Sequence, residues 1–219
     1  DGKAHLNAYL DDYVFLIDAG LELLQARWRD GDLDFLIELS ETLLDHFEDK
    51  RDGGFFFTSN DHEKLIHRPK PASDEAIPAG NGIAAQVLLR LGHLLGDTHF
   101  LDAAERTIKA LYSNIERYPS GHNALLSAVE EYLYPTQTIV LRGETVAMQA
   151  WQARCQRVYA PRRLTLAIPS DARDLPGILT QRVARNAVTA YVCSGHACEA
   201  PITELASLDA ALAKDEQQR

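Results

Sequence analysis

The chain has few residues of several kinds, and each shortage narrows what the protein can be. Three cysteines occur in 219 residues, too few for the disulfide framework of a small secreted domain. Lysine and arginine number 22 against 32 aspartates and glutamates, a formal charge of −10. This charge argues against nucleic acid and anionic membranes as partners. No apolar run is long enough to cross a bilayer, and the first residues lack the pattern of a signal peptide.

The remaining composition is that of an ordinary folded domain, with 46% hydrophobic and 25% charged residues. The length allows one large domain, or one domain with a small appendage. With so few cysteines, we expect a cytoplasmic setting. Because the chain begins at Asp1 and not at Met, we expect it to be cut from a longer protein, from which an N-terminal address could be lost.

Apolar spacing predicts five helices that alternate in character. The segments 12–29, 80–95 and 123–134 are apolar over most of their circumference, so we expect them to be buried. The segments 33–48 and 99–117 each have one apolar stripe and one charged face, which is typical of a surface helix. This alternation predicts helical hairpins, arranged either as two concentric rings or as a stacked solenoid.

A short β-hairpin is predicted between the second and third helices. Gly53 and Gly54 are a turn signal, and the aromatic run 55–58 follows. After a polar turn at 60–63 comes the second predicted strand, at 65–69. The prolines that come next predict an irregular loop.

After Pro135 the predicted elements change from helices to an order of strand, helix and strand. This order predicts a small, partly parallel sheet. We therefore expect two domains, residues 1–134 and residues 135–219. The expected elements of the second are strands at 138–142, 163–168 and 189–193 and helices at 147–159 and 207–214.

Six short runs along nearly the whole chain appear in an order that resembles one known family. They are DDYVFL (11–16), GGFFFT (53–58), RPK (68–70), IPAGN (77–81), AYVC (190–193) and CEAP (198–201). In this order they resemble the C-terminal part of the YyaL and spermatogenesis-associated thioredoxin-domain proteins, the DUF255 family. The chain departs from the family pattern at Asp74-Glu75-Ala76 and at Gly82.

The resemblance implies a mainly α fold, a partial (α/α)6-type barrel of helical hairpins with the β-hairpin inserted and a small C-terminal α/β unit after it. Such a barrel is similar to N-acylglucosamine 2-epimerase and to the six-hairpin glycosidases. It also implies that a thioredoxin-like domain and earlier hairpins of the full-length protein are partners of this segment. A partial barrel exposes apolar flanks, so we expect either a homo-oligomer or a gap filled by the C-terminal tail.

Two similar phrases, PAGNG (78–82) and PSGHN (119–123), each open an apolar helix. Free N–H groups and the helix dipole at such starts favour hydroxyls and anions. The alternative is that both asparagines are ordinary N-caps. The predicted ligand-binding residues are Tyr13, Arg68, Asp74, Asn81 and Asn123.

Asp12, His67 and His122 are the predicted catalytic residues. Sugar chemistry often pairs two carboxylates, but Asp11 and Asp12 point about 100° apart on a helix. Epimerisation needs one group to remove a proton and another to return it, which suits histidine. The alternative is that these histidines are surface or turn residues.

Cys193 and Cys198 are the predicted redox residues. Four residues separate them, a spacing that fits neither a redox Cys-x-x-Cys nor a zinc knuckle. A reversible disulfide between them and a purely structural pair of thiols both remain open. We expect no metal and no cofactor.

These features favour a protein that binds a sugar or polyol at the rim of the barrel, with epimerase-, isomerase- or glycosidase-like activity that needs more than this segment. The alternative is a non-catalytic scaffold, or a redox accessory module, for the thioredoxin-like domain.

Overall fold

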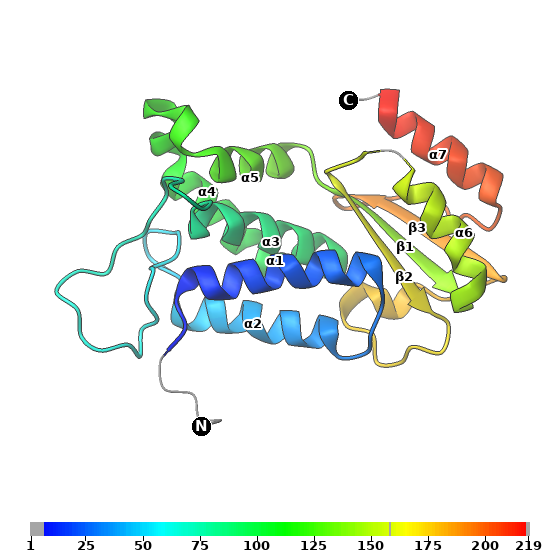
Figure 1. The fold of residues 1–219 in the computed structure, drawn as a ribbon, viewed down its shortest axis with the longest axis horizontal. Helices are drawn as coiled ribbons and strands as arrows, with labels where there is room; N and C mark the ends of the chain where they lie inside the picture. Colours follow the sequence, from blue (N-terminus) through cyan, green and yellow to red (C-terminus); the bar gives the residue numbers. More distant parts are fainter. Residues whose placement is uncertain (1–6, 158, 218–219) are drawn as a thin grey trace. The chain divides into compact units, whose positions relative to one another are not determined.

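The structure is a computed structural model that describes residues 7–157 and 159–217. About half of the chain is α-helical, and the described residues form seven helices and one four-stranded sheet (Figure 1). None of the described helices has both the length and the apolar character needed to cross a bilayer. The chain divides into two compact units: unit 1 comprises 1–21, 33–92 and 97–134, and unit 2 comprises 22–32, 93–96 and 135–219.

The five helices predicted in the first part of the chain all form, each within three residues of its expected bounds. Asp97 caps the fourth helix, because its side chain accepts a hydrogen bond from the His99 N–H at 2.8 Å. The helices are α1 (Leu10–Ala26), α2 (Asp32–His46), α3 (Gly80–Leu95), α4 (Thr98–Arg117) and α5 (Asn123–Leu133), with a 3-10 turn η1 (Pro119–Gly121) before α5.

The first helix is less buried than its apolar composition predicts. Leu16 is 47% exposed and Leu23 is 42% exposed. Its inaccessible residues instead follow helical spacing of three or four, the pattern of a single buried stripe. They are Leu10, Val14, Ile17, Leu21 and Leu24.

The start of α3 packs against the starts of two other helices in unit 1 (Figure 1). A Cβ at Gly80 would collide with Leu10 and Asp11 at the start of α1. A Cβ at Gly82 would lie 2.7 Å from the carbonyl carbon of Ala124 at the start of α5. The two glycines therefore allow the N-termini of α1, α3 and α5 to gather at one end of the unit.

The predicted β-hairpin between 55–58 and 65–69 is wrong, because neither run forms a strand. Phe55 makes only an isolated bridge to Glu48. The N–H and C=O of Phe55 bond instead to the Asn81 side chain, at 2.7 and 2.9 Å. A side chain from α3 thus occupies the backbone groups that a partner strand would need.

The sheet of unit 2 confirms the predicted mixed topology, in the order β2-β1-β3-β4. The pair β1–β2 is parallel and is joined through α6, whereas β3 runs antiparallel to both β1 and β4. The elements are β1 (Gln137–Gly143), α6 (Thr145–Gln156), β2 (Arg163–Pro169), β3 (Val188–Ser194), β4 (Ala197–Cys198) and α7 (Leu205–Gln217).

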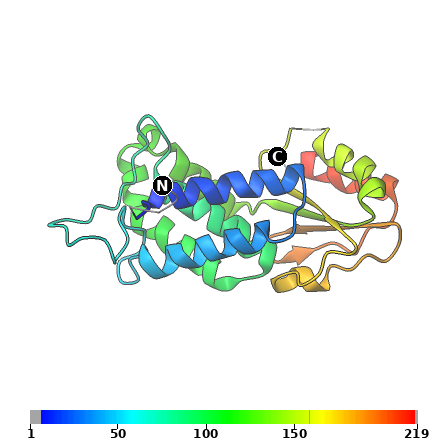
Figure 2. The ribbon, with the colours of Figure 1, turned by 60° about the horizontal axis from the view of Figure 1, so that its bottom comes forward.

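One buried cluster of unit 2 lies on the face of the sheet that packs against α6 and α7. Ile139 and Leu141 of β1 pack in a buried cluster with Trp151 of α6 and Leu208 of α7. Figure 2 shows the 3-10 helix η2 (Gly177–Gln181) on the opposite side of the sheet from α6 and α7.

Candidate functional site

A cavity of about 350 Å³ opens in unit 1 where α1 begins and α2 ends. Its volume falls in the range of small-molecule sites, roughly 300–1,000 Å³. Aromatic and polar side chains are mixed in its walls. The walls include Tyr13, Thr42, His46, Phe47, Ser59 and Asp61.

Asn60 holds the loop side of this cavity against the end of α2. Its backbone N–H donates to the carbonyl of His46 at 2.8 Å, and its side-chain amide donates to the carbonyl of Asp45 at 3.1 Å. Its amide oxygen lies 2.8 Å from Nδ1 of His46. These bonds satisfy two of the carbonyls that a helix end leaves free, and they fix the neighbouring Asp61 at the cavity.

Only Tyr13 among the predicted site residues lines this cavity. The tilted ring of Tyr13 lies 5.2 Å from that of Phe47, centroid to centroid. The sequence offered a weak signal for the rest of the site, because the polar run at 60–63 was assigned to the turn of a hairpin. The residues that could have indicated the site are His46, in the last turn of α2, and the polar run 60–63 that follows it in the chain.

Asn81 lies inside α3 and is completely buried. Besides its two bonds to Phe55, it donates to the carbonyl of Pro71 at 2.8 Å. An amide has two donor hydrogens and two acceptor lone pairs, and these three bonds use both of the hydrogens and one of the lone pairs. Asn81 therefore links α3 to the preceding loop by hydrogen bonds and is not an N-cap.

Asp74 and His122 also hold loop segments to neighbouring helices by hydrogen bonds. One carboxylate oxygen of Asp74 accepts from the Ala79 N–H at 2.9 Å and the other from the Ala124 N–H at 3.0 Å. Asp74 thus caps α5 from a distant loop. The His122 ring is held on both nitrogens, by the Tyr118 carbonyl at 2.7 Å and the Ser73 hydroxyl at 3.2 Å.

The other predicted residues of unit 1 do not join the cavity. Asn123 is exposed, and its amide donates to a carbonyl of η1 at 3.1 Å. His67 is exposed on the long loop. Arg68 donates to the carbonyl and hydroxyl of Thr58, and its guanidinium lies 4.2 Å from the centre of the Phe56 ring.

The adjacent carboxylates at the start of α1 differ in environment. Asp12 is exposed and accepts a hydrogen bond from the Tyr9 N–H at 2.8 Å. Oδ1 of Asp11 is buried and has no hydrogen-bond partner within the described residues. Burial, helped by the charge of Asp12, raises the pKa of Asp11. Of the two carboxyl groups, Asp11 is the one whose protonated form burial favours.

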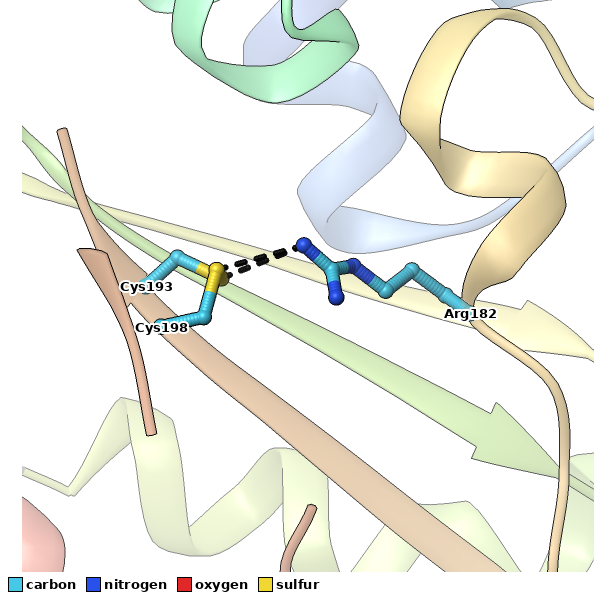
Figure 3. Close-up of a disulfide and its surroundings, with 3 residues drawn as sticks. All are labelled: Arg182, Cys193 and Cys198. Carbon is cyan, nitrogen blue, oxygen red and sulfur yellow. Dashed lines mark hydrogen bonds between the residues drawn. A yellow bond between two sulfur atoms is a disulfide. The ribbon is translucent and has the colours of Figure 1, made fainter. Parts of the chain in front are cut away.

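Cys193 and Cys198 form a disulfide in unit 2 (Figure 3). They face each other across β3 and β4, which Gly195 and His196 connect in a tight turn. The Nη2 atom of Arg182 lies 3.2 Å from Sγ of Cys198 and 3.6 Å from Sγ of Cys193. The redox role of the pair stays a prediction.

The third cysteine, Cys155, lies in the core of unit 2. Burial raises the pKa of its thiol to about 11, which keeps it protonated and unreactive at neutral pH. Over the ranges 7–157 and 159–217, no three His, Cys, Asp or Glu side chains come together as a metal site would require.

The chain is similar to human spermatogenesis-associated protein 20, with 28% identity over 90% of the chain, and to the mouse protein, with 26% over 90%. It is also similar to an uncharacterised protein of Caenorhabditis elegans, with 24% over 95%. The chain covers 26% of the human and mouse proteins and 29% of the nematode protein, so it spans about a quarter of these relatives. No protein-family model matches it. The similarity supports the resemblance to spermatogenesis-associated proteins.

Proposed function

We propose that unit 1 binds a sugar or a related polyol in the cavity at the start of α1, as part of a carbohydrate-active, epimerase-like protein. The mixed cavity wall carries this proposal. Tyr13 and Phe47 offer aromatic surface, and Thr42, His46 and Asp61 offer hydrogen-bonding groups. A sugar has both an apolar C–H face and a ring of hydroxyls, so its binding needs both kinds of surface.

His46 is suited to the proton transfer that epimerisation needs. Nδ1 faces an oxygen of Asn60 that can only accept, so Nδ1 carries the hydrogen and Nε2 is the basic nitrogen of the neutral ring. Histidine is the side chain that most often acts as a general base in enzymes. We assign the base role to His46.

The proposal also makes unit 1 a segment of an (α/α)6 ring. The gathering of the starts of α1, α3 and α5 at one end supports this, because hairpins in a ring alternate in direction. Leu16 of α1 and Phe35 of α2 are each 47% exposed. Exposed apolar side chains on these helices are what missing neighbouring hairpins would cover.

Isothermal titration with hexoses, amino sugars, disaccharides and acyclic polyols tests the binding. We expect saturable binding by one of these classes. Tyr13→Ala should weaken it by about fivefold to tenfold, the loss expected for an aromatic contact. Tyr112→Ala is the matched control, because Tyr112 is 48% exposed on α4 and outside the cavity. If none of these compounds binds to the folded protein, the proposal is wrong.

The proton-transfer roles have a separate test. The sugar is incubated in D2O with the full-length protein that contains this segment, and deuterium entry at the reacting carbon is followed by NMR. His46→Gln should keep binding and abolish the exchange. If deuterium enters at the same rate with this variant, His46 is not the base.

A further inference from the structure

The disulfide of unit 2 has a cation beside both of its sulfur atoms. Nη2 of Arg182 lies 3.2 Å from Sγ of Cys198 and 3.6 Å from Sγ of Cys193 (Figure 3). An arginine stays charged at any physiological pH, and a cation near sulfur stabilises the thiolate. Arg182 therefore favours the reduced, anionic form of whichever sulfur is released.

The guanidinium is held in this place by the sheet. It lies over the ring of Tyr191, 5.2 Å from its centre. Tyr191 is 3% exposed, and its hydroxyl donates to the carbonyl of Val183 at 2.7 Å. Tyr191 and Cys193 are two residues apart on β3, so they share one face of the sheet. The cation is thus fixed before any bond opens, and this limits the reorganisation that reduction needs.

The pair is also open to attack from solvent. Cys198 is exposed on β4, the edge strand, whereas Cys193 is half-buried. Backbone pairing of β3 with β4 already closes the short turn at Gly195 and His196. Because a disulfide stabilises a fold more when it closes a longer loop, this bond adds little as a staple.

We propose that Cys193–Cys198 is an exchangeable disulfide that a dithiol reductant opens, with Arg182 stabilising the leaving thiolate. A thiolate of the reductant attacks Sγ of Cys198 and forms a mixed disulfide. The Cys193–Cys198 bond breaks, and its electron pair leaves on Sγ of Cys193, beside Arg182. A lower thiol pKa makes this a better leaving group.

The second thiolate of the reductant then attacks the reductant's own sulfur in the mixed disulfide and releases Cys198. Two electrons pass from the dithiol, which becomes a disulfide, to the protein, which becomes a dithiol. The two protons of the reductant go to the released sulfurs, or to solvent where Arg182 keeps a thiolate. This chemistry belongs to unit 2 and does not depend on sugar binding by unit 1.

A redox titration tests the role of Arg182. The whole chain is equilibrated at pH 7 with mixtures of reduced and oxidised dithiothreitol, labelled with maleimide and weighed by mass spectrometry. We expect two labels to appear on reduction, while buried Cys155 stays unlabelled. Arg182→Gln should need at least a threefold higher ratio of reduced to oxidised reagent for half-reduction. Arg182→Lys keeps a cation, so its half-reduction should need a lower ratio of reduced to oxidised reagent than that of Arg182→Gln. Arg185→Gln, at an exposed position, is the control and should need the same ratio as the wild type.

The pH profile of alkylation of the reduced wild type is a second test, and it does not depend on whether Arg182→Gln folds. One thiol should react with a midpoint below the ordinary cysteine pKa of about 8.5, and circular dichroism confirms the fold. A midpoint at or above that value overturns the proposal. So does a native disulfide that persists in excess dithiothreitol, or a folded Arg182→Gln variant that titrates like the wild type.

Discussion

At the scale of the residue, the neighbours Asp11 and Asp12 should respond oppositely to the same substitution. Because the folded state raises the pKa of Asp11, the contribution of Asp11 to stability is fully present below the ordinary pKa of about 4 and is lost as pH rises through the raised value. Asp11→Asn should remove this fall and increase stability at pH 7. Asp12→Asn should lower stability, because it weakens the acceptor for the Tyr9 N–H. Urea unfolding from pH 3 to 7 measures both, and a change of the same sign would contradict this account.

The sequence identified residues that matter locally, but not what they contact. Asn81 was correctly expected at the start of a helix and Asp74 in the irregular loop before it, because turn and capping residues mark such starts. Their partners, Phe55 and Ala124, lie 26 and 50 residues away in the chain. Contacts at such separations depend on how the hairpins pack, so spacing alone could not reveal them. The cavity was missed for the same reason, since its walls come from three separate segments.

At the scale of the element, Gly82 should be required for the close approach of α3 to α5. A Cβ here would lie 2.7 Å from the carbonyl carbon and the Cβ of Ala124, and backbone cannot swing aside. Gly82→Ala should therefore cost about 1–3 kcal/mol, the usual range for overpacking, despite alanine's better helix propensity. Ser113→Ala, at an exposed position of α4, is the control and should be neutral or slightly stabilising. Equal urea midpoints for the two variants would show that the helices can separate.

The loop between α2 and α3 should lose its anchor in acid. Nζ of Lys70 donates to the Asp49 carboxylate at 2.8 Å and to the Gly53 carbonyl at 2.9 Å. The hydrogen bond from Lys70 is the main cause that lowers the pKa of Asp49. Its stabilisation is therefore present above the ordinary aspartate pKa and is lost as pH falls through the lowered value. Lys70→Met should reduce this acid-dependent loss in urea unfolding, and an unchanged pH profile would argue against the anchor.

At the scale of the whole molecule, order and class of the elements followed from periodicity, since buried stripes and turn residues are local signals. The assignment of residues to the two compact units did not follow from periodicity. Residues 22–32, from the end of α1 onward, group with the sheet of unit 2, as do residues 93–96. A single boundary in the sequence cannot describe these units, because each unit is built from three separate segments of the chain.

Gln25 shows why those separate segments matter for unit 2. Its side-chain oxygen accepts from the Thr165 N–H of β2 at 3.0 Å, and its carbonyl accepts from the Gln152 amide at 2.7 Å. Since β2 is an edge strand, the Thr165 N–H has no strand beyond it to bond. Gln25→Ala should speed exchange of the Thr165 amide hydrogen by about fivefold, the equivalent of roughly 1 kcal/mol. Gln152→Ala removes the other bond and should leave that amide protected. If the Thr165 amide exchanges equally in wild type and Gln25→Ala, residues 135–219 do not rely on α1 to protect this edge.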